Sequence, residues 1–174
     1  MTRFVVLLRG VNVGAHNRIS MPDLRSLLER LGCADVVTYL QSGNAVVGWS
    51  GSAEALRGAV TGALAAELGL PVQVLVRTSA QLDAVVAGNP FDVDDPTRLH
   101  VAFLSGPPPP VDADALLPDR VAPGPEVLYV AYAGGSQGSR AAKLLSGKQL
   151  GVIASARNWR TVLALQELAR GRSA

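Results

Sequence analysis

The sequence has one cysteine, two histidines and few aromatic residues, and each scarcity removes a class of protein. Cys33 has no partner for an intrachain disulfide, and its neighbourhood has no Cys or His at a zinc-binding spacing. His16 and His100 have no acidic or nucleophilic neighbour at a spacing typical of a catalytic set. The acidic stretch DVDDP, residues 92–96, lacks the rest of a calcium loop. We therefore expect no metal and no cofactor. No catalytic residue is identified, and enzymatic activity stays open.

Long hydrophobic runs are also missing. The first ten residues, MTRFVVLLRG, contain five consecutive apolar residues, too few for a signal peptide or a membrane span. With 48% hydrophobic and 17% charged residues, the composition is that of a folded globular protein. We expect a cytoplasmic protein without membrane attachment and leave its oligomeric state open.

Charge is unevenly distributed along the chain. When Lys and Arg are counted against Asp and Glu, residues 1–82 carry +2, residues 83–135 carry −6 and residues 136–174 carry +6. The basic last block is typical either of an anion-binding region or of a surface that packs near an acidic one. The imbalance is well below that of a nucleic-acid-binding tail.

The first half of the sequence predicts the order β-α-β-β-α-β. Short valine-rich runs predict strands over residues 3–9, 35–41, 45–50 and 71–77. Ser20 and Ser52 are typical N-caps, and the apolar residues after them predict helices that end near Gly32 and Gly69. This order is that of a ferredoxin-like fold, in which two helices cover one face of a four-stranded antiparallel sheet.

The second half predicts a less regular α/β layer that resembles the first. Helices are expected over residues 79–88, 140–150 and 158–170, and strands over residues 99–106, 126–133 and 152–156. The prolines of residues 107–110 form a stiff extended connector, and residues 112–117 form a short helical turn. We place the domains at residues 1–78 and residues 79–174.

The opening loop, residues 9–18, is the first candidate binding segment. Arg9 ends the first strand, and Asn12, His16 and Asn17 supply hydrogen-bond donors between glycines. The loop has neither the Lys-Ser pair of a P-loop nor a GxGxxG pattern. It either binds an anion, with Arg9 as the charge, or is only a well hydrogen-bonded turn.

Three further polar stretches contain candidate residues. QSGN, residues 41–44, offers Ser42 and Asn44 but also has the composition of an ordinary hairpin turn. GGSQGSRAAK, residues 134–143, is either an anion site or a flexible loop before a helix. SARNWRTV, residues 155–162, combines Arg157, Asn158 and Trp159. Asn158 is a typical helix cap, and Trp159 either packs in the core or stacks on a ring of a ligand.

The chain contains three longer motifs, which are LLRGVNVGAHNRISMPDLRSLLERLG, VVTYLQSGNAVV and ARNWRTVLALQELA. Together, and in this order, they resemble the bacterial DUF1697 family, whose members are uncharacterised. The chain departs from the family pattern at Ala15-His16, where a Gly-Lys pair is common, and at Ser155-Ala156, where a Thr-Thr pair is common. His16 supplies the charge of that lysine only when it is protonated. The motif positions are Arg9, Gly10, Asn12, Gly14, Asn17, Gln41, Ser42, Gly43, Asn44, Arg157, Asn158, Trp159 and Thr161.

The resemblance implies an α+β fold of two ferredoxin-like (α/β-plait) subdomains with antiparallel sheets covered by helices, and it implies no established activity. Because polar motifs come from both chain ends, we hypothesise that they meet in one cleft. Our leading hypothesis is a binding domain for a small anionic or nucleotide-like ligand in a cleft between the subdomains. The alternatives are binding of RNA or single-stranded DNA, and an enzyme of unassigned reaction. The expected ligand-binding residues are Arg9, Asn12, His16, Asn17, Ser42, Asn44, Arg157, Asn158 and Trp159.

Overall fold

The computed structural model describes residues 1–171, and these divide into two compact units. The first unit comprises residues 1–82 together with the described residues from Ala164 on, and the second comprises residues 83–163. The division therefore falls inside helix α3 (Ser79–Ala87) and inside helix α5 (Trp159–Ala169). The domain limits expected from the sequence, residues 1–78 and 79–174, stay a prediction.

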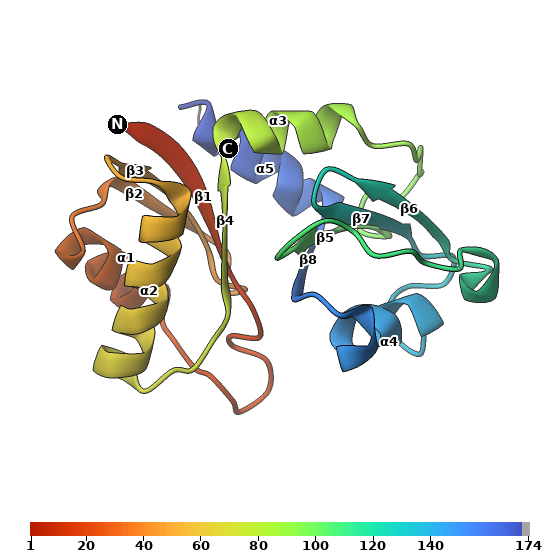
Figure 1. Cartoon of the computed structure of the whole chain (residues 1–174), viewed down its shortest axis with the longest axis horizontal. Helices are drawn as coiled ribbons and strands as arrows, with labels where there is room; N and C mark the ends of the chain where they lie inside the picture. Colours follow the sequence, from red (N-terminus) through yellow and green to blue (C-terminus); the bar gives the residue numbers. More distant parts are fainter. Residues whose placement is uncertain (172–174) are drawn as a thin grey trace. The chain divides into compact units, whose positions relative to one another are not determined.

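The first unit is a four-stranded antiparallel sheet with two helices on one face (Figure 1). The strands are β1 (Thr2–Leu8), β2 (Ala34–Tyr39), β3 (Asn44–Trp49) and β4 (Val74–Thr78), in the spatial order β2-β3-β1-β4. The helices are α1 (Met21–Arg30) and α2 (Ala53–Leu68). The predicted order β-α-β-β-α-β is confirmed.

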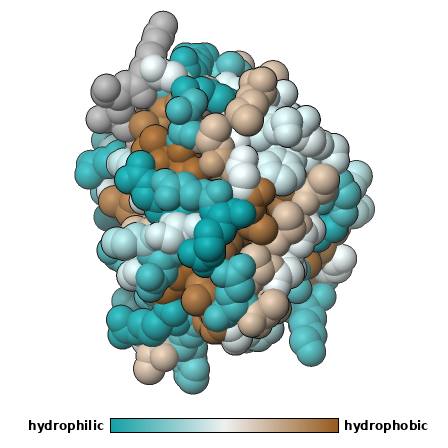
Figure 2. Space-filling view, turned by 90° about the vertical axis from the view of Figure 1, so that its left-hand side faces the viewer, coloured by the Kyte–Doolittle hydropathy of each residue, from teal (hydrophilic) through white to brown (hydrophobic). Residues whose placement is uncertain are grey.

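Local signals explain where these two helices begin and end. The Ser20 hydroxyl accepts a hydrogen bond from the Asp23 amide at 3.1 Å, and Ser52 caps α2 in the same way. The α2 helix ends at Gly69, whose left-handed φ of 61° suits glycine. Leucines of α1 are buried against the sheet whereas its charged residues are exposed. On this side of the molecule, hydrophilic and hydrophobic residues are interspersed on the surface (Figure 2).

The second unit repeats the topology of the first. Its strands are β5 (Leu99–Leu104), β6 (Arg120–Gly124), β7 (Val127–Ala131) and β8 (Ala154–Asn158), in the order β6-β7-β5-β8. A single 3-10 turn, η1 (Asp114–Leu116), stands where the first unit has α1. The α4 helix (Arg140–Ser146) and the turn η2 (Lys148–Leu150) stand where the first unit has α2. The chain is an α+β protein with two ferredoxin-like subdomains.

Two expectations for the second unit are wrong. The sequence pattern misses β6, because this segment is an edge strand that includes Pro123, a residue that central strands exclude but edges tolerate. The helix expected over residues 140–150 ends at Ser146, since Gly147 takes an extended backbone and separates α4 from η2.

Neither sheet has an open face. In β1, Phe4 and Val6 pack against the helices, and the residues between them point to the other side, where Val5 and Leu7 are also fully buried. In the second unit the Tyr129 hydroxyl, on the side of the sheet away from α4, donates a hydrogen bond to the Val85 carbonyl of α3 at 2.6 Å. Both faces of each sheet are therefore covered.

The two strand-to-helix junctions have the same local structure. The β4 strand runs directly into α3, and β8 runs directly into α5. The Thr78 hydroxyl accepts a hydrogen bond from the Gln81 amide at 3.1 Å, and the Asn158 side-chain oxygen accepts one from the Thr161 amide at 2.9 Å. The predicted capping role of Asn158 is confirmed, and each unit ends its sheet with a capped helix.

We predict that Gly43→Ala lowers the free energy of unfolding by about 3 kcal/mol, because the added methyl group is both strained and crowded. Gly43 has a φ of 84°, and a Cβ there would lie 2.6 Å from Val11 Cγ2 and 2.8 Å from Leu8 Cβ. Gly14 is the control, since its φ is 60° but a Cβ would meet nothing within 4 Å. Gly14→Ala should cost only about 1 kcal/mol. Urea unfolding measures both, and equal losses would contradict the steric explanation.

Candidate functional site

Asn12 joins the opening loop to two other segments of the first unit. Its side-chain NH2 group donates to the Ile19 carbonyl at 2.9 Å and to the Gln41 carbonyl at 2.6 Å. Its side-chain oxygen accepts from the Ile19 amide at 2.9 Å. The loop is thereby held against the start of α1 and against the turn between β2 and β3. The opening loop and the QSGN turn thus meet, although they are far apart in sequence.

The backbone of the opening loop depends on residues that tolerate positive φ. Asn12 and Asn17 have φ values of 55° and 50°, a region that asparagine enters more readily than most residues. The Asn12 amide donates to the Asn17 carbonyl at 3.0 Å, and the Asn17 side chain donates to the Gly10 carbonyl at 3.3 Å. Between them, Val13 and His16 form a short bridge at the exposed tip. The loop is an ordered hairpin.

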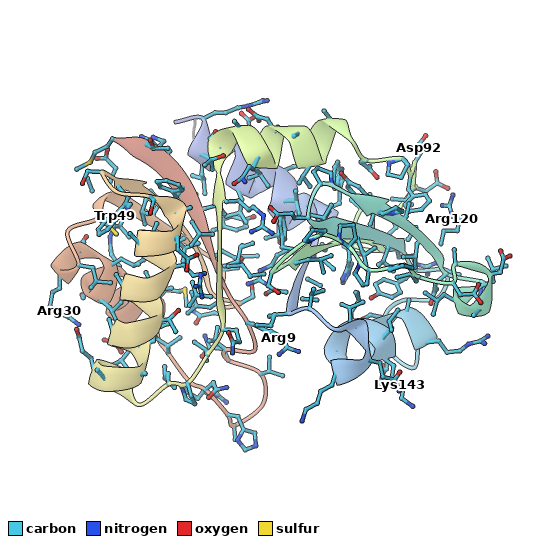
Figure 3. All side chains as sticks on the ribbon, viewed as in Figure 1. Arg9, Arg30, Trp49, Asp92, Arg120 and Lys143 are labelled. Carbon is cyan, nitrogen blue, oxygen red and sulfur yellow. The ribbon has the colours of Figure 1, made fainter. Side chains whose placement is uncertain are left out.

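The QSGN turn is also fixed from within. Asn44 is fully buried, and its side chain donates to the Tyr39 carbonyl and to the Ser42 hydroxyl, both at 2.8 Å. The Gly43 carbonyl accepts from the Leu8 amide at 2.9 Å, which ties the turn to the end of β1. Arg9, labelled in Figure 3, is half-buried just beyond β1, and its amide donates to the Gln73 carbonyl at 2.9 Å. These contacts give Ser42 and Asn44 a structural role, and binding by them stays a prediction.

A hollow of about 560 Å³ opens where these segments meet, and we name it the opening-loop hollow. It lies entirely within the first unit. Its lining residues are Asn12, Arg18, Ile19, Ser20, Asp23, Gln41 and Leu68. The volume lies within the range of roughly 300–1,000 Å³ that is usual for small-molecule sites.

Three polar side chains of this hollow have no protein partner. In the part of the chain that the structure describes, the guanidinium of Arg18, the carboxylate of Asp23 and the side-chain amide of Gln41 make no hydrogen bond or ion pair. All three are exposed. The sequence itself does not single out Arg18 or Asp23, because nothing local shows that they share a hollow with Gln41.

The remaining predicted site residues lie in the second unit. Arg157 is buried, and its Nη1 donates to the Ser155 hydroxyl and to the Ala156 carbonyl, both at 2.9 Å. Burial lowers the pKa of Arg157 to about 10. Asn158 caps α5, and Trp159 beside it is half-buried. The structure thus brings each group of motif residues together within its own unit, and a cleft shared by both groups stays a prediction.

The glycine-rich stretch before α4 surrounds a buried carboxylate that the sequence does not single out. Asp119 accepts hydrogen bonds from the Ala133 amide at 2.8 Å and from the Ser139 hydroxyl at 2.6 Å. Arg140 donates to the Leu117 carbonyl at 3.1 Å. A second hollow, of about 320 Å³, lies here. Because both oxygens of Asp119 have protein donors, this carboxylate orders the loop.

Two classes of feature are missing from residues 1–171. No group of three or more His, Cys, Asp or Glu residues in this range is arranged to hold a metal ion. No helix within the same range is long and apolar enough to cross a membrane.

The model of the family described as "Protein of unknown function (DUF1697)" matches residues 1–131. The chain belongs to the DUF1697 family. This confirms the family resemblance, and the matched range includes the first two of the three motifs but not the third, residues 156–169.

The fold of this DUF1697 chain is similar to that of the conserved bacterial protein SP0830 from Streptococcus pneumoniae. The TM-score is 0.76 at 22% sequence identity, and the alignment covers 97% of this chain and 98% of that one. At such identity the likeness shows the fold alone. No curated protein matches the chain.

We predict that Asn12→Ala in this DUF1697 chain lowers the free energy of unfolding by about 2–3 kcal/mol, because three hydrogen bonds are lost. Asn17→Ala is a matched control, since Asn17 has a similar φ but its side chain makes a single bond at 3.3 Å. Asn17→Ala should lower the free energy of unfolding by about 1 kcal/mol. Urea unfolding compares the two, and an Asn17→Ala variant as unstable as Asn12→Ala would show that backbone strain, not bonding, sets the loss.

His100 gives a pH-dependent prediction. Its Nε2 lies 3.1 Å from the Thr97 carbonyl and its ring meets Tyr132 edge-on, and burial lowers its pKa. The unfolded chain therefore takes up a proton at a pH where folded His100 stays neutral, so this histidine favours unfolding as the pH falls below about 6.5. We predict that His100→Gln loses less stability than the wild type between about pH 7 and about pH 5. Urea unfolding at both pH values measures the free energy of unfolding of the two proteins. Equal decreases in the wild type and in His100→Gln would contradict the prediction.

Proposed function

We propose that the protein is a binding domain for a small anionic ligand and that the opening-loop hollow of the first unit holds this ligand. The observation that carries the proposal is the Arg18 guanidinium, which lines the hollow and has no partner in the described chain. Guanidinium groups bind carboxylates and phosphates through paired, charge-assisted hydrogen bonds. An unpaired one in a hollow of small-molecule size therefore suits an anion.

The surroundings of Arg18 support the same ligand class. Ser20 lines the hollow, and its oxygen accepts from the Asp23 amide, so its hydroxyl hydrogen is available to a ligand. The three bonds of Asn12 hold the wall of the hollow in place before a ligand arrives. A fixed wall reduces the entropy that binding must remove.

The second unit provides an internal comparison. Its corresponding corner, between the segment after β5, the turn η1 and the end of α4, also has a hollow, of about 230 Å³. That hollow is lined mainly by apolar residues, including Pro109, Val111, Leu144 and Leu150. Its lining also includes Asp112 and Gln149 but no cation. The same topology therefore does not by itself place a cation in this corner, and we take a ligand to be the explanation for Arg18 in the first unit.

The nucleic-acid alternative has less support. Plait proteins that bind single-stranded RNA stack bases on aromatic residues of an exposed sheet face. Here both faces of each sheet are covered, and Val5 and Leu7 of β1, which face away from the helices, are aliphatic and buried. The proposal includes binding only and assigns no reaction.

We predict that Arg18→Ala abolishes ligand binding and that Lys143→Ala does not. Lys143 is the control because it is an exposed cation of α4, outside the hollow (Figure 3). The measurement is thermal unfolding with inorganic phosphate, a nucleoside monophosphate and small carboxylates, at low and physiological salt. A ligand at about a hundred times its dissociation constant adds about 2.7 kcal/mol of stability, a shift of several degrees.

Nuclear magnetic resonance of the same samples locates the site. The proposal expects amide shift changes at Arg18, Ser20 and Gln41 in the wild type and in Lys143→Ala. Equal stabilisation of Arg18→Ala, or no stabilisation by any of these anions, would show that the hollow is not an anion site.

A further inference from the structure

The opening-loop hollow contains a carboxylate as well as a guanidinium. Asp23 and Arg18 both line it, and no ion pair joins them or links either to another described residue. Two opposite charges that share a hollow without pairing leave both to be satisfied by solvent or by a ligand. A simple anion would pair with Arg18, but the nearby charge of Asp23 would weaken its binding. A ligand with both charges would satisfy the two groups together.

Apolar side chains lie beside these charges. Leu68 lines the hollow and is 39% exposed. Ile19 also lines the hollow but is buried. Leu68 therefore offers an exposed aliphatic surface to a molecule in the hollow. The hollow therefore combines a cation, an anion and an apolar border.

We propose that the ligand is a small zwitterion of the amino-acid class with an aliphatic side chain. Its carboxylate pairs with Arg18, its ammonium group pairs with Asp23, and its side chain packs against Leu68. The amide of Gln41, which has no protein partner in the described chain, is available to the ligand's polar atoms. This inference rests on the proposed function, because it names the ligand class of the same site.

Asp23 also has a structural role that the test must separate from binding. It lies in the first turn of α1, where a negative charge stabilises a helix. Glu54 lies in the first turn of α2, outside the hollow. Glu54→Gln therefore controls for the loss of a helix-start charge, and Asp23→Asn removes the charge that the proposal assigns to the ligand.

The experiment titrates four compounds into the full-length protein and follows amide chemical shifts. L-leucine has both charges, N-acetyl-L-leucine lacks the ammonium group, L-leucinamide lacks the carboxylate, and glycine lacks the aliphatic side chain. We expect leucine to bind at least about tenfold more tightly than each of the other three. Asp23→Asn should weaken leucine binding by about tenfold without weakening that of N-acetyl-L-leucine, and Glu54→Gln should change neither.

The outcomes separate this inference from the proposed function. If N-acetyl-L-leucine binds as tightly as leucine and Arg18→Ala weakens both, the anion site stands and the zwitterion is wrong. If phosphate or another simple anion binds through Arg18 while all four compounds fail, the zwitterion is again wrong and the anion site stands. If glycine binds as tightly as leucine, the proposed packing of an aliphatic ligand side chain against Leu68 is wrong. If neither these compounds nor the simple anions bind, both proposals fail.

Discussion

The hydrogen bonds of the Asn12 side chain are the constraint on which the candidate site depends. The backbone of Asn12 has a left-handed φ of 55°. Its side-chain amide joins the loop after β1 to the residue before the α1 cap and to the β2–β3 turn. The lining of the opening-loop hollow comes from these same segments and from the end of α2. Without this connection Arg18 would lie on a mobile loop, where a cation binds anions weakly because ordering it costs entropy.

The first unit follows closely from its sequence because its signals are local. Ser20 and Ser52 cap the helices, and valine-rich runs form the strands as expected. The second unit follows less well because its features depend on distant partners. The β6 strand pairs with β7 despite Pro123, and only the fold shows that this segment lies at a sheet edge. By contrast, the short helical turn expected over residues 112–117 is present as η1.

The candidate site shows the same division. Residue types identified the opening loop and the QSGN turn as polar segments worth attention, and these do come together. The residue types did not indicate which polar atoms are left to bind a ligand after the contacts within the protein are made. Asn44 looks like a ligand-binding residue in the sequence, yet its amide satisfies its own turn, as a buried polar group must. Asp23 looks like a helix-start residue, yet its carboxylate faces a hollow without a partner in the described chain.

The first unit is discontinuous in sequence, and this sets the order in which a growing chain can complete it. The described residues from Ala164 to Gly171 belong to the first unit, and the Arg3 side chain near the amino terminus donates a hydrogen bond to the Leu168 carbonyl at 3.1 Å. Domains usually fold as they leave the ribosome, the amino-terminal one first. Here every residue of the second unit is synthesised before the last segment of the first. The unit that begins first is therefore finished last, and a ribosome that stalls before Leu168 leaves it without its closing helix turn.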